Sequence, residues 1–155
     1  MVHFYFALLV YFTFAFDIPK KLYGMPAPKK DDLENLAKTG IKSIVCLLED
    51  NSNIKDYHEK GFKSLWLPVA DDKAPTFEQV EKLVSFIDEQ NRNNNPVAIH
   101  CQGGKGRTGT LIASYLIAKG SSYEEAMNQI ETNQPNAIKK DFQINFLKEL
   151  SKKEK

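Results

Sequence analysis

The sequence is poor in three features that often reveal function directly: cysteine, arginine and net charge. Only two of the 155 residues are cysteines, Cys46 and Cys101, which is too few for a disulfide framework or a zinc site. The net charge of +1 argues against a polyanionic partner such as nucleic acid. A single cysteine beside a histidine is typical of a reactive thiol in a reducing compartment, so we expect a cytoplasmic protein.

The N-terminus is apolar but lacks the positive charges that open a secretory signal peptide, because no Lys or Arg precedes Lys20. The apolar run stops at Asp17, whereas a membrane-spanning helix needs roughly 20 apolar residues. Its aromatic and β-branched residues favour a buried strand. A membrane anchor, an uncleaved signal peptide and an extension outside the fold are the alternatives, and residues 1–12 receive no role.

The rest of the chain alternates between predicted strands and predicted helices, and its length suits a single domain over residues 1–155. This alternation of strands and helices along the chain predicts an α/β fold. We expect a three-layer sandwich in which helices flank a mainly parallel central sheet of four to five strands. After the N-terminal run, strands are predicted at 20–28, 42–50, 62–69 and 96–101, and helices at 30–40, 51–61, 76–92, 107–120, 122–131 and 140–153.

Some individual residues can be placed from these patterns. Thr76 and Glu78 are predicted to open the helix over 76–92. Trp66 is expected in the core, His58 on a helix surface, and Cys46 in a buried strand as a small core residue rather than as a disulfide partner of Cys101. We assign no chemistry to Trp66 or His58.

The segment "AIHCQGGKGRTGT", residues 98–110, combines a thiol with a glycine-rich loop between a predicted buried strand and a predicted buried helix. Backbone N–H groups of such a loop can surround an oxyanion, with the positive end of the helix beneath them. We expect Gly103, Gly104 and Gly106 to provide the positive φ angles and the close approach that this requires. A Walker loop is a competitor, but "GKGRT" does not read Gly-Lys-Ser/Thr and the cysteine would be unexplained.

The side chains around this loop suit a nucleophilic thiolate. Amide dipoles, the helix N-terminus and a guanidinium all favour a Cys101 thiolate at neutral pH. Arg107 is one of only two arginines, and its planar fork can bind two oxygens of a tetrahedral anion. Thr108 is placed to hydrogen-bond the sulfur, and His100 is expected to support the loop because a preformed thiolate needs no base.

A His-Cys pair followed after five residues by Arg-Thr is the signature of the cysteine-dependent protein tyrosine phosphatases. The chain resembles their small atypical dual-specificity branch and its archaeal relatives over residues 14–152, chiefly in "FDIPKKLYGMPAPKKDDLENLAKTGIKSIVCLLED" and "HCQGGKGRTGTLIASYLI". The resemblance implies phosphomonoester hydrolysis through a cysteinyl-phosphate on Cys101, without metal or other cofactor. It implies phosphate binding by residues Gln102, Gly103, Gly104, Lys105, Gly106 and Arg107.

The resemblance also implies a general acid between two prolines, after a strand. When the segment from Pro68 to Pro75 is matched to the family, this position is Asp71, and Asp72 is the second candidate. The alternative is that both acids only solvate a turn. Asp71 would act as base in the second step. The segment "QPNAIKKDFQINFL" matches the family's water-orienting helix with Gln143, for which an exposed helical glutamine is the alternative. Relatives usually read Arg-Pro where this chain has Gln134-Pro135.

The expected substrates are phosphotyrosine proteins, with phosphoserine and phosphothreonine proteins as further candidates. Lys105 resembles a lysine of the tensin-like lipid phosphatases, although the first lysine of their "KxGKGRTG" pattern is Gln102 here. A phosphoinositide or inositol-phosphate phosphatase is therefore the alternative, and Lys139 and Lys140 are candidates for the same rim. A catalytically silent phosphate-binding module is the alternative of a different class. We expect a monomer, with membrane association as an alternative.

Overall fold

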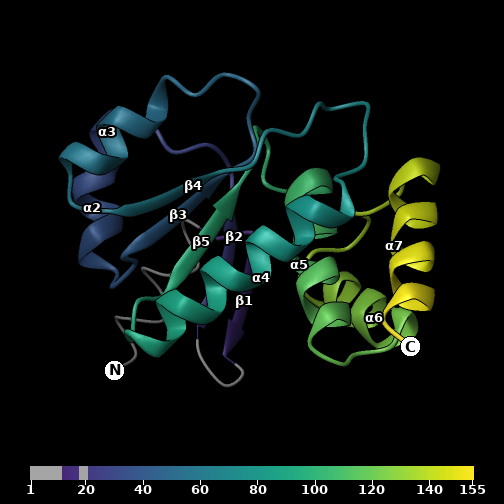
Figure 1. The fold of residues 1–155 in the computed structure, drawn as a ribbon. Coiled ribbons are helices and arrows are strands. Elements are labelled where there is room, and N and C mark those ends of the chain that lie inside the picture. Colours follow the sequence, from purple (N-terminus) through teal and green to yellow (C-terminus); the bar gives the residue numbers. More distant parts are fainter. Residues whose placement is uncertain (1–11, 18–20) are drawn as a thin grey trace.

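A computed structural model describes residues 12–17 and 21–155 of the chain (Figure 1). In this part of the chain, five strands form one sheet in the order β1-β2-β5-β3-β4. The β1 and β2 strands pair antiparallel, and every other neighbouring pair is parallel. The predicted mainly parallel sheet is confirmed. The strands span Phe14–Asp17 (β1), Lys21–Met25 (β2), Ser43–Cys46 (β3), Lys63–Trp66 (β4) and Val97–His100 (β5).

The apolar N-terminal run contributes strand β1, in which Phe14 and Phe16 are buried. The prediction of a strand is thus correct for Phe14–Asp17, but the strand lies at the edge of the sheet and Ala15 is exposed, so only the face with Phe14 and Phe16 is buried. The part of the prediction that concerns residues 1–11 lies outside the described residues. Among the residues that the structure describes, no helix combines the length and the apolar character needed to cross a membrane.

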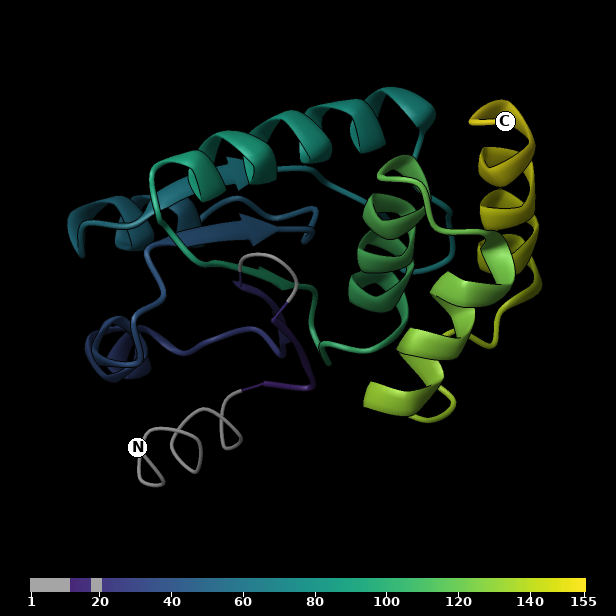
Figure 2. The ribbon, with the colours of Figure 1, turned by 90° about the horizontal axis from the view of Figure 1, so that it is seen from below.

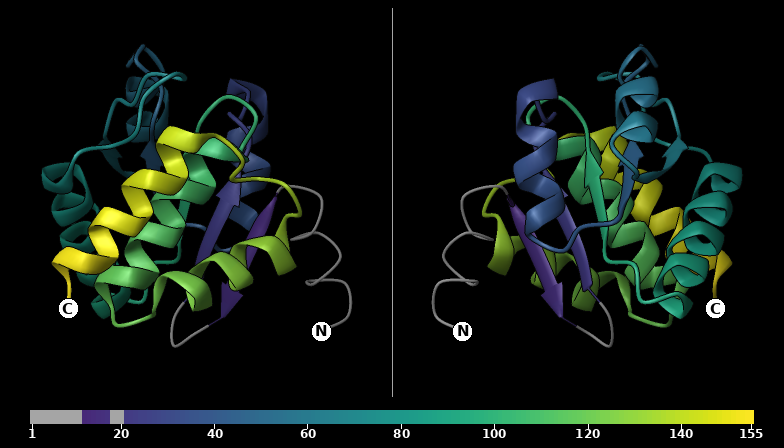
Figure 3. Two further views of the ribbon diagram at one scale, coloured as in Figure 1. Left: turned by 90° about the vertical axis from the view of Figure 1, so that its right-hand side faces the viewer. Right: turned by 90° about the vertical axis from the view of Figure 1, so that its left-hand side faces the viewer.

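Helices cover both faces of the sheet (Figures 2 and 3), which confirms the flanked, three-layer arrangement. The α2 and α3 helices lie on one face, and α4, α5, α6 and α7 lie on the other. The helical segments are η1 (Lys30–Asp32), α2 (Leu33–Lys38), α3 (Asn53–Glu59), α4 (Phe77–Arg92), α5 (Gly106–Ala118), α6 (Tyr123–Asn133) and α7 (Asp141–Lys153).

Alternating side chains of the central strands divide the core between these two faces. On β3, Ile44 and Cys46 pack in the cluster beneath α2 and α3, whereas Val45 joins the larger cluster beneath α4 to α7. The β5 strand lies between β2 and β3, at the middle of the sheet. The loop that follows β5 therefore emerges at the carboxyl ends of parallel strands, where open α/β sheets commonly bind ligands.

The prediction that Trp66 lies in the core is wrong. Trp66 is 40% exposed rather than in the core, and its indole N–H donates to the carbonyl of Leu48. The reason is that β4 is an edge strand, so its last residue is not covered from both sides. The prediction that Thr76 and Glu78 open α4 is confirmed, since Thr76 is the N-cap and Glu78 lies in the first turn, and Gln79 completes a capping box with Thr76.

Candidate active site

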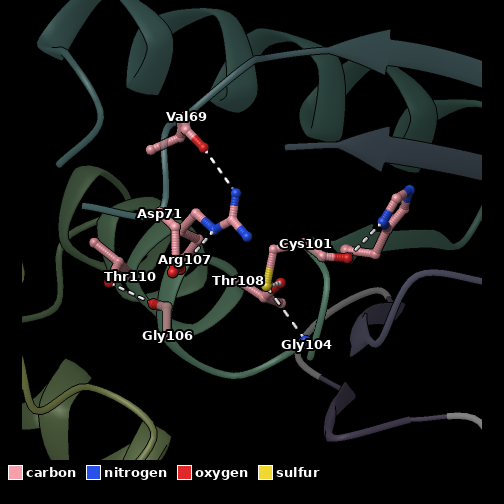
Figure 4. Close-up of polar contacts among 9 residues, drawn as sticks. Val69, Asp71, Cys101, Gly104, Gly106, Arg107, Thr108 and Thr110 are labelled. Atoms are coloured by element: carbon pink, nitrogen blue, oxygen red, sulfur yellow. Dashed lines mark hydrogen bonds and ion pairs between the residues drawn. The ribbon is translucent and has the colours of Figure 1, made fainter. Parts of the chain in front are cut away.

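The sulfur of Cys101 lies at the base of the glycine-rich loop, one residue beyond the end of β5. The backbone N–H of Gly104 donates a hydrogen bond to Sγ over 3.3 Å, and Thr108 Oγ1 donates another over 3.2 Å (Figure 4). Cys101 is 3% exposed and Thr108 is fully buried. The expected contact between the Thr108 hydroxyl and the sulfur is therefore present.

The surroundings of Cys101 lower the pKa of its thiol, although burial by itself acts in the opposite direction and is the largest single influence. The Thr108 hydroxyl, the backbone N–H groups of Thr108 and Gly104, and the charge of Arg107 all favour the thiolate, and together they outweigh burial. The direction agrees with the expected thiolate. The physical cause is an assembly of several donors around one sulfur.

The three loop glycines have different roles. Gly104 has φ +74°, and a Cβ atom there would lie 2.5 Å from the backbone nitrogen of Pro26, so this position requires glycine. The expectation of positive φ is wrong for Gly103 and Gly106, which do not adopt it. A Cβ at Gly103 would meet nothing within 4 Å, whereas one at Gly106 would lie 3.2 Å from Gln143 Nε2. Gly106 thus permits the close approach of Gln143.

Arg107, in the first turn of α5, links the loop to the segment after β4. Its Nη1 donates to the carbonyl of Val69 over 2.9 Å, and its Nε lies 3.5 Å from Asp71 Oδ1 (Figure 4). The Arg107 side chain is 10% exposed, but that of Asp71 is 94% exposed. An ion pair with one fully solvated partner contributes little to stability, so Asp71 can move without a large cost. Asp72 is exposed as well.

His100 supports the loop from within the sheet, where it is fully buried. Its Nδ1 lies 2.9 Å from the carbonyl oxygen of Cys101, and its Nε2 lies 2.8 Å from the hydroxyl of Tyr57 on α3. Burial lowers the pKa of His100, which favours a neutral ring. Because a carbonyl oxygen only accepts, Nδ1 carries the hydrogen and Nε2 accepts from Tyr57. The geometry agrees with the expected supporting position.

Gln143 lies in the first turn of α7 and is only 3% exposed. The alternative of an exposed helical glutamine is therefore wrong. Its Oε1 has no hydrogen-bond partner within residues 12–17 and 21–155, and its amide lies against Gly106 of the loop. A buried carbonyl without a partner is costly, which makes it available to a molecule bound at the loop.

The remaining predicted residues lie on the loop, just before α7, or in the core. Lys105 is exposed and immediately precedes α5, and Gln102 and Gly103 are exposed too. Lys139 and Lys140 are exposed just before α7. Cys46 is fully buried with a free thiol, and burial raises its pKa. That position agrees with a small core residue.

The sequence did not reveal three groups that hold the site: the Tyr57 hydroxyl, the Val69 carbonyl and the Thr13 hydroxyl, which donates to the carbonyl of Gly104. Each lies on a separate segment, between 38 and 91 residues from its partner. No local motif marks such a contact. A pattern of apolar and polar residues predicts helices and strands, but not which distant residues meet.

Comparisons with known proteins agree with this geometry. The family model described as "Polymorphic toxin system, DSP-PTPase phosphatase" matches residues 19–121. The crystal structure of Tk-PTP in the active form shares 30% identity and a TM-score of 0.79, and the match covers 84% of this chain and 91% of that one.

Curated relatives include protein tyrosine phosphatase type IVA 3 of Mus musculus, 28% identical over 79% of this chain and 72% of that protein. The tyrosine-protein phosphatase CDC14 of Candida albicans is 27% identical over 69% of this chain, which spans only 20% of that protein. The family model matches more than half of the chain and coincides with the loop that holds the buried thiol. The chain therefore belongs to the DSP-PTPase phosphatase family.

Proposed function

We propose that this chain, acting as one catalytic domain over residues 1–155, is a phosphomonoesterase of phosphotyrosine proteins and also of phosphoserine and phosphothreonine proteins. The observation that carries the proposal is the surroundings of the Cys101 sulfur, where Thr108 and Gly104 donate hydrogen bonds and Arg107 adds positive charge. Such donors favour a thiolate, which is the nucleophilic form of cysteine.

In the first step, the Cys101 thiolate attacks phosphorus, so that an S–P bond forms and the bond from phosphorus to the leaving oxygen breaks. Asp71 donates its proton to that oxygen. The guanidinium of Arg107 and the loop amides bind the remaining phosphate oxygens, whose charge they stabilise in the transition state. The 3.5 Å separation between Arg107 Nε and Asp71 Oδ1 supports the proposal that both side chains act on the same phosphate ester.

In the second step, water attacks phosphorus, the S–P bond breaks and phosphate leaves. Gln143 orients the water through Oε1, the buried carbonyl beside Gly106. The Asp71 carboxylate takes the proton from the water, and the Thr108 hydroxyl stabilises the departing thiolate. Atoms and charges balance over the two steps, which return Cys101 and Asp71 to their starting forms.

A second candidate substrate class rests on Lys105, an exposed cation within the loop. Together with the exposed Lys139 and Lys140, it supports binding of anionic groups beyond the reacting phosphate. Phosphoinositides and inositol phosphates carry such groups, so they form the alternative. We favour phosphoproteins because Lys105 is a single residue and exposed lysines commonly only offset substrate charge. The two free thiols support a cytoplasmic location, and we propose a monomer.

The decisive experiment combines a chemical trap with a substrate panel. We expect the wild-type protein to hydrolyse an aryl phosphate and to yield a phosphocysteine when quenched rapidly, whereas Cys101→Ser should do neither. Cys46→Ser is the matched control and should retain turnover. The panel compares a phosphotyrosine peptide, phosphoserine and phosphothreonine peptides, and soluble phosphoinositides by kcat/KM. Turnover in Cys101→Ser would refute the mechanism, and a preference for phosphoinositides would establish the alternative.

A further inference from the structure

Two hydrogen bonds from outside the phosphate-binding loop hold carbonyl groups of the loop. Thr13 Oγ1 donates to the carbonyl oxygen of Gly104 over 2.5 Å, and the backbone N–H of Ala27 donates to that of Gln102 over 3.0 Å. Thr13 immediately precedes β1, and Ala27 follows β2. Both donors therefore flank the antiparallel pair of strands at one edge of the sheet.

The chain segment that contains Thr13 is held in place by a backbone hydrogen bond and by the packing of Phe14. The Thr13 backbone N–H donates to the carbonyl of Gly24 over 2.7 Å, and the next residue, Phe14, is 1% exposed. The Phe14 ring lies between two glycines, because a Cβ atom would come within 2.5 Å of it at Gly24 and within 3.1 Å at Gly109. Thr13 is thus anchored against both β2 and the start of α5.

A carbonyl that is held on one side of the loop directs an N–H to the other side. In a trans peptide, the C=O and N–H bonds point in opposite directions. When Thr13 holds the oxygen of Gly104, the N–H of Lys105 must point away from Thr13. Gly104 turns its own N–H toward the Cys101 sulfur. The same reasoning applies to the N–H of Gly103, because Ala27 holds the oxygen of Gln102.

Without this hydroxyl, the Gly104–Lys105 peptide plane could rotate at little cost. Such a rotation changes ψ of Gly104 and φ of Lys105, and glycine tolerates most backbone angles. Gly104 already has φ +74°. A rotated peptide would turn its carbonyl oxygen, instead of an N–H, toward a bound phosphate. Any population of that state reduces the apparent affinity for an oxyanion in proportion.

We propose that Thr13 is a positioning residue of the phosphatase site, whose hydroxyl keeps the Gly104–Lys105 peptide oriented with its N–H toward the phosphate. The inference rests on the proposed function and adds a residue that lies ahead of residues 19–121, the part matched by the family model. It also joins the loop to the last part of the apolar N-terminal run, directly ahead of β1.

The test is the affinity of the purified 155-residue chain for tungstate, a non-hydrolysable tetrahedral oxyanion, measured by calorimetry. Thr13→Val removes the hydroxyl but keeps the side-chain volume, and it should weaken tungstate binding by about three- to tenfold, the effect of one neutral hydrogen bond. Thr13→Ser retains a hydroxyl and should bind within about twofold of wild type. The free energy of unfolding is measured for each variant by urea titration.

Thr39 provides a matched control, because its Oγ1 donates to the carbonyl of Leu36 over 2.6 Å at the end of α2. The chain then enters β3 at the amino end of the parallel strands, whereas the loop follows the carboxyl end of β5. Thr39→Val should lose stability and keep wild-type tungstate affinity. Equal tungstate affinity in wild type and Thr13→Val would overturn the inference, since the hydroxyl would then only stabilise the fold. Absence of tungstate binding and of aryl phosphate hydrolysis in the wild type would instead refute the proposed function.

A second measurement needs no variant and therefore does not depend on Thr13→Val folding. In the wild-type protein, saturation with tungstate should shift the amide resonance of Lys105 and slow the exchange of its hydrogen with solvent. An unchanged Lys105 amide, in a protein whose Gly104 amide responds, would contradict the proposed orientation of this peptide.

Discussion

The hydroxyl of Thr108 lies 3.2 Å from the sulfur of Cys101, although the two residues are seven positions apart in the sequence. The contact exists because α5 begins at Gly106, directly after the loop turns back at Gly104. The first turn of a buried helix thereby supplies both a hydroxyl and backbone N–H groups to one sulfur. This arrangement links the acidity of the thiol to the start of α5.

Replacing Thr108 should therefore raise the pKa of the Cys101 thiol. We expect Thr108→Val to move the midpoint of the pH dependence of iodoacetamide alkylation to higher pH, because the thiolate loses one donor while burial still opposes its charge. Turnover of an aryl phosphate should fall about 10-fold or more, since the thiolate is also the leaving group of the second step. Ser114→Ala, which removes a buried hydroxyl farther along α5 that donates to Thr110, should leave the midpoint unchanged.

The two acids after β4 should differ in their effect on chemistry. Asp71 lies near Arg107, and both Asp71 and Asp72 are exposed. We expect Asp71→Asn to lower kcat about 100-fold for a substrate with a poor leaving group and much less for one with a good leaving group, because only the poor one needs the proton. Asp72→Asn should stay near wild type for both. The opposite ranking of the two variants would assign the acid to Asp72.

Gln143 should affect activity and stability in opposite ways. Because its buried Oε1 lacks a partner, Gln143→Met should fold with unchanged or slightly higher free energy of unfolding. The variant should hydrolyse the phosphoenzyme slowly, so that stopped-flow traces with an aryl phosphate show a burst of released phenolate.

Gln90 offers the contrasting control, since its buried Oε1 accepts from Ser43 Oγ and Asn95 Nδ2, each over 2.9 Å. Gln90→Met should destabilise the fold by about 1–3 kcal/mol, because two partners lose their acceptor, and should show no burst. A stable Gln143→Met variant with full steady-state turnover would argue against water positioning by Gln143.

The free energy of unfolding should decrease at acidic pH because His100 is buried. Burial lowers the pKa of His100 in the folded protein from its usual 6.5, so below that pH the unfolded chain binds a proton that the folded protein excludes. The free energy of unfolding should thus fall as pH falls below about 6.5, by at most about 1.4 kcal/mol per pH unit for one proton. Urea titrations between pH 7.5 and 5 should show this slope in wild type and in His58→Gln, and a smaller slope in His100→Gln.

The sequence by itself determined which reactive residues the loop carries and most of the fold. Residues 98–110 carry the thiol, the glycines and Arg107 within one short segment. Because few residues separate the end of the predicted strand from the start of the predicted helix, these groups must lie close together. Apolar periodicity likewise located the strands and helices, because burial of one face imposes a period of two or of about 3.6 residues. Both the content of the loop and the periodicity are local properties, because they depend on residues that are close together in the sequence.

Tertiary structure decided which distant groups meet at the loop and which side chains are covered. Thr13 reaches the site because the antiparallel β1 begins beside the carboxyl end of β2, which is the neighbour of β5. Tyr57 reaches it because α3 packs against the face of the sheet that carries Ile44 and Cys46. Trp66 is exposed because β4 is the last strand of the sheet, an order that no local pattern records. Contacts of this kind depend on packing across tens of residues, so the chain must fold before they exist.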